Sequence, residues 1–188
     1  MSMSILILLY PRSSCTILGC TSVLAYISLV PLMEQIILSI LKGERPELSI
    51  SADEVETYER KGGYTLLAES VVVDPDHPEQ LNTVLREVLG YWCKQYPNRY
   101  VEKIYADAAT GHGDILARKL YFSPLYHISD TAYVLDLRKP GISKVVRSFQ
   151  ECLKQKENQI QDKRVATNLP KNGRQQVSRP ESDAKTAV

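Results

Sequence analysis

The apolar residues in the centre of the chain alternate between the spacing of strands and the spacing of helices. Residues 64–73 and 101–109 are rich in β-branched and aromatic side chains, which predicts two strands. Between them, residues 81–92 place Leu, Val and Trp at intervals of three and four, which predicts an amphipathic helix. A short helix over 114–120 and a strand over 131–137 follow. Strands joined by helices predict an α/β fold in which the first two strands lie parallel.

Apolar segments also flank this centre. Residues 23–30 are β-rich, whereas residues 32–41 and 142–153 have helical spacing. From about Lys154 onward the chain is polar and has no apolar period, which predicts a disordered tail. The predicted organisation is an apolar segment (1–22), an α/β domain with a mixed central sheet flanked by helices (23–153) that carries an insertion (33–63), and a polar tail (154–188).

The N-terminal apolar stretch has two interpretations. Residues 15–33 carry no charge, and their number approaches the ~20 residues needed to cross a bilayer. However, Gly19, Pro31 and several hydroxyl residues dilute the stretch, and Arg12 follows the first apolar run instead of preceding it as in a signal peptide. We therefore expect a buried strand, and a membrane span is the alternative.

Charge and composition exclude some classes of protein. The 188 residues are 44% hydrophobic with a net charge of +1, which excludes a chain that is disordered throughout and gives no basic footprint for nucleic acid. Four cysteines (Cys15, Cys20, Cys93, Cys152) contain no CxxC pair, so we expect reduced thiols in a cytoplasmic protein. The three histidines lie far apart in the sequence, and no metal site is predicted.

Five segments follow one another in an order that is typical of a known family. They are LAYISLVPL (24–32), TLLAESVVVDP (65–75), the helix 81–92, EKIYADAAT (102–110) and GDILARKLYF (113–122). In this order they resemble the third strand, the fourth strand, the next helix, the fifth strand and the closing helix of the GNAT superfamily of acyl-CoA-dependent N-acyltransferases. The resemblance covers roughly residues 23–137. Only about twenty residues precede it, so either the domain is shortened or residues 4–10 supply a replacement strand.

The resemblance implies an activity and a set of site residues. The activity is transfer of an acyl group, acetyl above all, from acyl-CoA to an amine that attacks the thioester directly. Glu69 matches the position of the family's catalytic glutamate and would take the proton of the amine. The implied acyl-CoA contacts are the strand end Val71, Val72 and Val73, and the helix start Gln80, Leu81, Asn82 and Thr83. For Glu69 alone, the other interpretation is a strand charge that faces solvent or pairs with a lysine.

Two departures from the family pattern favour another function. The family's pyrophosphate loop is rich in glycine, whereas this chain has His77-Pro-Glu-Gln-Leu-Asn82, in which Pro78 has no N–H and Glu79 is negatively charged. If Phe122 matches the family's phenylalanine, the family's general-acid tyrosine falls on Ala117. The alternative function is therefore a GNAT-like binding or regulatory module without catalysis. The acceptor amine and the oligomeric state, a homodimer included, stay open.

Other polar residues have simpler interpretations. Asp107 near the end of a predicted strand either orients an acceptor amine or forms the next turn, and the turn is favoured. His77 and His112 are expected to lie on loops, and Gly111-His-Gly113 to form a tight turn. Cys93, beside Trp92 on an amphipathic helix, is expected to be a half-buried structural thiol because Lys94 alone does not activate it.

Overall fold

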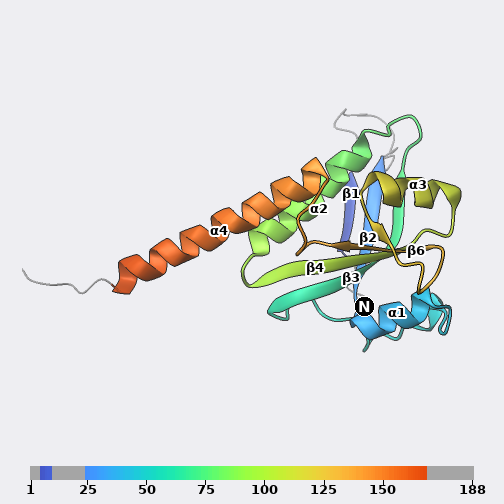
Figure 1. The fold of residues 1–188 in the computed structure, drawn as a ribbon, viewed down its shortest axis with the longest axis horizontal. Helices are drawn as coiled ribbons and strands as arrows, with labels where there is room; N and C mark the ends of the chain where they lie inside the picture. Colours follow the sequence, from blue (N-terminus) through green and yellow to red (C-terminus); the bar gives the residue numbers. More distant parts are fainter. Residues whose placement is uncertain (1–4, 10–23, 169–188) are drawn as a thin grey trace, which may run out of the picture.

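The fold is built on one mixed sheet of six strands. The structure, a computed structural model, describes residues 5–9 and 24–168. The strand order is β1-β2-β3-β4-β6-β5 (Figure 1). The elements are β1 (Ile5–Leu9), β2 (Ala25–Pro31), α1 (Glu34–Leu41), the short 3-10 helix η1 (Glu47–Ser49), β3 (Gly62–Val73), α2 (Gln80–Gln95), β4 (Arg99–Asp107), α3 (Gly111–Lys119), β5 (Ser123–Pro124), β6 (Ala132–Asp136) and α4 (Lys144–Asn168).

The pairing confirms the α/β architecture that the sequence predicts. β3 and β4 are parallel neighbours and are connected by α2, whereas the other adjacent strands pair antiparallel. β1 pairs with β2 from Ile5 opposite Leu29 to Leu9 opposite Ala25, so residues 5–9 add an edge strand to the sheet. Residues 52–54 form turns, and the N–H and hydroxyl of Ser51 both donate hydrogen bonds to Glu54 Oε2 at 2.9 Å.

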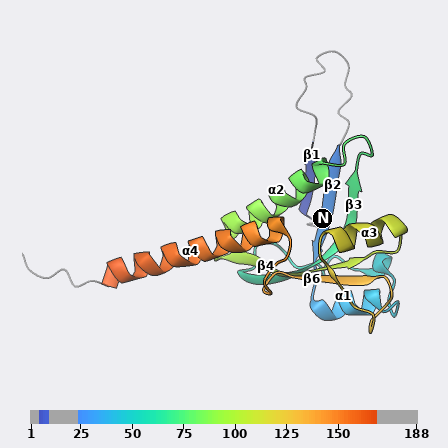
Figure 2. The same ribbon diagram turned by 45° about the horizontal axis from the view of Figure 1, so that its top comes forward.

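Helices cover both faces of the sheet. Figure 2 shows α1 on one side of the sheet and α2 and α4 on the other. On the α2 side, Trp92, Tyr64 and Leu66 are fully buried in one apolar core. On the α1 side, Ile37 and Leu67 belong to a second core. The sheet is therefore buried on both faces, as its continuous apolar strands predict.

A β-bulge interrupts the regular alternation of β3. Ser28 of β2 pairs with Ser70, but the next residue of β2, Leu29, pairs with Ala68, so Glu69 is an extra residue in β3. Before the bulge, Leu67 packs in the α1-side core; after it, Val71 and Val73 pack against the α2-side core. Strict alternation along the strand predicts that Glu69, Leu67, Val71 and Val73 share one face of the sheet. This prediction is wrong, because the extra residue at the bulge moves Val71 and Val73 to the face opposite Leu67.

The structure joins Cys93 of α2 to Cys152 of α4 in a disulfide, with their Cα atoms 6.3 Å apart. The expectation of reduced thiols is therefore wrong for this pair. The two cysteines are far apart in sequence, and only the packing of α4 against α2 brings them together.

Helix α4 is longer than its apolar stripe. Val146 and Phe149 are buried against the α2-side core, and the helix then continues beyond the sheet to Asn168 (Figure 1). The sequence predicted a disordered tail from 154; the Lys, Gln and Glu residues there are good helix formers, which explains how a polar segment extends the helix. Residues 169–188 of this predicted tail lie outside the described residues.

The described parts of the chain, 5–9 and 24–168, contain no helix that is both long enough and apolar enough to cross a membrane. Most of the stretch 15–33 that suggested a span is either β2 or lies among residues 10–23, outside the described residues.

Candidate functional site

The parallel strands β3 and β4 separate at their carboxyl ends. Their pairing ends at Ala68 opposite Ala106, whereas β3 continues to Val73 beside β2 alone. A cavity of about 310 Å³ lies at this point. Its walls are formed by strands β2, β3, β4 and β6 together with helices α2 and α3 and the start of α4. Phe122, which lies between α3 and β5, completes the lining. Ligand sites in α/β proteins commonly lie at such carboxyl ends of strands.

Polar and apolar residues occupy different parts of the cavity wall. The polar side chains come from strand ends and helix starts, and most of them are exposed: Glu69, Ser70, Asp107, Thr110, His112 and Ser143. The buried wall residues are apolar: Ile27, Leu29, Val88, Leu89, Ile104, Ala108, Ala117 and Val146. We call the first set the rim and the second set the floor.

Glu69 lies on the rim, at the bulge of β3. The hydroxyl of Ser28 donates a hydrogen bond to its Oε2 at 2.6 Å. Ser28 is itself 6% exposed and is the one buried polar residue found among the described residues. A hydroxyl of the neighbouring strand thus holds the carboxylate of Glu69, an exposed residue that lines the cavity, and a held carboxylate suits the exchange of a proton with a bound molecule.

A second carboxylate comes from the insertion that precedes β3. Glu47 lies on η1, and partial burial together with the negative charges of Glu69 and Asp107 raises its pKa. Asp107 also lines the cavity. Carboxylates from three separate segments therefore influence one another where the strands part, and their combined negative charge would attract a cation. Glu47 could not be selected from the sequence, since its position depends on how the insertion folds back.

Helix α3 begins at the rim. Thr110 caps it, because its side chain accepts a hydrogen bond from the N–H of Gly113 at 3.0 Å. His112 is exposed, as expected, but it lies in the first turn of α3 and lines the cavity. Its imidazole can donate or accept a proton at the rim. From the sequence, His112 could be predicted only as a turn residue, because the fold decides whether this turn lies beside Glu69.

The resemblance to the GNAT superfamily would align a general-acid tyrosine with position 117, which is an alanine. Ala117 lines the floor with a methyl group and is 6% exposed. Tyr126, the phenol of the segment that follows β5, is 62% exposed and does not line the cavity.

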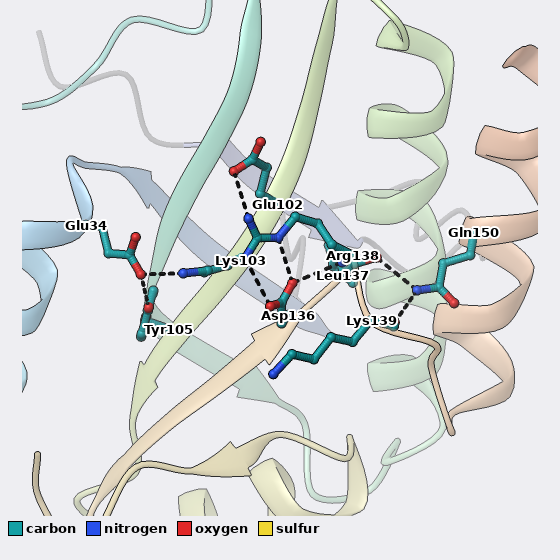
Figure 3. Close-up of polar contacts among 9 residues, drawn as sticks. All are labelled: Glu34, Glu102, Lys103, Tyr105, Asp136, Leu137, Arg138, Lys139 and Gln150. Atoms are coloured by element: carbon teal, nitrogen blue, oxygen red, sulfur yellow. Dashed lines mark hydrogen bonds and ion pairs between the residues drawn. The ribbon is translucent and has the colours of Figure 1, made fainter. Parts of the chain in front are cut away.

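Tyr105 is engaged on the α1 side of the sheet. Its hydroxyl donates a hydrogen bond to Glu34, which also pairs with Lys103 at 2.5 Å (Figure 3). Burial and the bond to Glu34 raise the pKa of Tyr105, and the two hydrogen bonds lower the pKa of Glu34. Beside them, Arg138 contacts Asp136 at 3.0 Å and Glu102 at 3.8 Å. This network ties α1 to the sheet and takes Tyr105 away from the cavity.

The start of α2 lies apart from the cavity lining. The N–H groups of Gln80, Leu81 and Asn82 donate to the carbonyl groups of the three preceding loop residues, at 3.1–3.4 Å. Thr83 follows inside the helix, and the first residue of α2 on the cavity wall is Leu85. His77 is an exposed loop residue with its Nδ1 3.6 Å from Glu79. The loop also carries the carboxylates of Asp74 and Asp76, so its surroundings are acidic.

The end of β3 is divided between cavity and surface. Val71 lines the cavity, Val72 is 45% exposed and Val73 packs against the α2-side core. Their pairing with β2 uses one edge of the strand, and the other edge faces the opening beyond Ala106. Backbone groups on such an edge are available to an extended ligand.

No group of three or more His, Cys, Asp or Glu side chains within residues 5–9 and 24–168 is arranged to hold a metal ion. In comparisons with known proteins, no protein-family model matches the sequence and no curated protein matches it significantly.

Proposed function

We propose that the protein is a GNAT-like N-acyltransferase that moves an acyl group from acyl-CoA to an amine. The observation that carries this proposal is the separation of two parallel strands over a cavity with Glu69 at its rim. In the family that the sequence resembles, the end of the fourth strand holds the pantetheine arm of the cofactor, and β3 would take the place of that strand. The exposed end of β3, Val71–Val73, would contact that arm, and Gln80–Thr83 would face its phosphates.

The carboxylates around the opening support a cationic acceptor. A primary amine reaches the site as an ammonium ion, which Glu47, Glu69 and Asp107 attract. Glu69 takes one proton, directly or through a water, and the neutral nitrogen attacks the thioester carbon. The C–N bond forms, the nitrogen gives up its second proton to solvent, and the C–S bond breaks. The CoA thiolate leaves and takes a proton from solvent or from the imidazole of His112.

A binding module without catalysis is the second candidate, and one observation favours it. The N–H groups at the start of α2 are already paired within a turn, and acidic residues surround them. Both features weaken the attraction for a pyrophosphate at this helix start. Such a module would keep the shape of the family and bind a protein or small amine at the carboxylates.

The test is an acylation assay with purified full-length protein, acyl-CoA of several chain lengths, and a panel of amines. The panel includes a polyamine, a lysine peptide and a neutral aromatic amine, and release of the CoA thiol is followed. We expect turnover with a cationic amine, and Glu69→Gln should lower kcat by about 10²- to 10⁴-fold while CoA binding is retained. Glu87→Gln, at an exposed position of α2 away from the cavity, is the matched control.

Two results would contradict the proposal. Absence of turnover together with binding of acyl-CoA would favour the binding module. Equal turnover by Glu69→Gln and the unchanged protein would remove Glu69 from the catalytic role.

A further inference from the structure

The floor of the cavity offers no hydrogen-bonding side chain. The floor residues, defined above, are aliphatic, and each is less than 9% exposed. Half-buried Leu85, Leu116 and Phe122 continue the apolar wall between α2 and α3. Every polar side chain of the lining belongs to the rim. A ligand that enters therefore finds polar partners at the opening and only hydrocarbon beyond it.

This division selects the part of a ligand that enters. An amide group placed on the floor would lose its hydrogen bonds to water and gain none from side chains there, which disfavours the pantetheine arm in this position. A hydrocarbon chain loses no hydrogen bond, and each methylene that it buries improves binding by about fourfold. An acetyl group is too small to fill a cavity of about 310 Å³. The wall residues beside the unfilled space would lack van der Waals contacts.

We propose that the cavity binds the hydrocarbon chain of a fatty acyl thioester, so that the transferred group is a fatty acyl group. The chain lies on the floor, and the thioester lies at the rim beside Glu69. The pantetheine arm then leaves along the exposed end of β3 near Val72. This inference rests on the proposed transferase function and names its donor. The amine still attacks the thioester carbon, the C–S bond breaks, and the products are a fatty amide and CoA thiol.

The geometry also separates donor and acceptor. The floor lies on the α2 side of the sheet, where Val88 and Val146 pack. Glu47 belongs to the insertion that joins α1 to β3. Burial and the negative charges of Glu69 and Asp107 raise its pKa. The acyl chain would thus occupy one face of the sheet, and the cationic amine would approach at the carboxylates where the strands part.

The experiment compares a series of saturated acyl-CoA donors from acetyl to dodecanoyl, below their micelle concentrations. Binding is measured by calorimetry and transfer by thiol release, with the full-length protein. The matching alkanoic acids serve as probes of the cavity that need no CoA. We expect affinity to rise about fourfold for each added methylene until the cavity is full and then to level off.

Two neighbouring residues of α3 provide a matched pair of variants. Leu116 lines the cavity, whereas Ile115 is 52% exposed and does not. Leu116→Trp should shorten the chain length at which affinity levels off and weaken dodecanoyl-CoA far more than acetyl-CoA. Ile115→Trp should change neither. If Leu116→Trp does not fold, Ala117→Leu narrows the same floor, with exposed Ala109→Leu as its control.

The outcomes separate this inference from the proposed function. Equal binding and transfer of acetyl and dodecanoyl groups would overturn the chain site while leaving the transferase intact. Binding of alkanoic acids that depends on chain length and on Leu116, without transfer from any acyl-CoA, would support the chain site and overturn the transferase. Binding that depends on chain length but is equal in both tryptophan variants would place the chain elsewhere and overturn the inference.

Discussion

The contact between Ser28 and Glu69 provides the sharpest test of how the site is held. Ser28 lies on β2 and donates to Glu69 Oε2 at 2.6 Å, a length typical of a hydroxyl bound to a charged carboxylate. Such a bond contributes about 1.5–3 kcal/mol, and because Glu69 is exposed the lower end applies. Ser28→Ala removes the donor and lets the carboxylate rotate. About 1.5 kcal/mol corresponds to roughly a tenfold fall in kcat.

A positioning role and a purely structural role give different kinetics. If Ser28 positions Glu69, Ser28→Ala should lower kcat with little change in the donor's KM, and Ser28→Thr, which keeps the hydroxyl, should recover most of the activity. Ser39→Ala is the control, since the Ser39 hydroxyl bonds to the carbonyl of Ile36 within α1. Unchanged kcat in Ser28→Ala, while Glu69→Gln is inactive, would refute the positioning role.

Three further predictions concern stability and cofactor binding. Cys93 and Cys152 are 59 residues apart, so replacing both by alanine should lower the free energy of unfolding in urea by up to about 4 kcal/mol, and an unchanged midpoint would argue against the disulfide. Hydrogen bonds from Arg45 and Ser51 lower the pKa of Glu54 to about 2 from 4.5. The stability that the ionised Glu54 provides is therefore present above about pH 5 and is lost as the pH falls toward 2. Glu54→Gln should remove this dependence of the free energy of unfolding on pH. Pro78→Gly should tighten acyl-CoA binding a few-fold in calorimetry by letting the backbone approach the phosphates, and unchanged affinity would contradict this account of the loop.

The periodic elements could be predicted from the sequence because their signals are local. The strand over 64–73, the helix over 81–92 and the strand over 101–109 correspond to β3, α2 and β4, and their order correctly placed two of them as parallel neighbours. The carboxylate of Glu69 could be selected because a charge inside an apolar strand is unusual.

The surroundings of Glu69 could not be predicted, since they depend on pairing between distant segments. The bulge arises from the register of β2 against β3, and a period of two along one strand contains no information about it. Glu47 reaches the site only because the insertion folds back, and its exposed sequence neighbours, Pro46 and Leu48, give no indication of a site. The disulfide likewise depends on α4 packing against α2.

The most direct test of the central claim is a calorimetric titration of the full-length protein with acetyl-CoA and with decanoyl-CoA. We predict one binding site, micromolar affinity for the decanoyl donor, weaker binding of the acetyl donor, and a clear loss of decanoyl binding in Leu116→Trp. If neither donor binds at millimolar concentration, the cavity between β3 and β4 is not an acyl-CoA site.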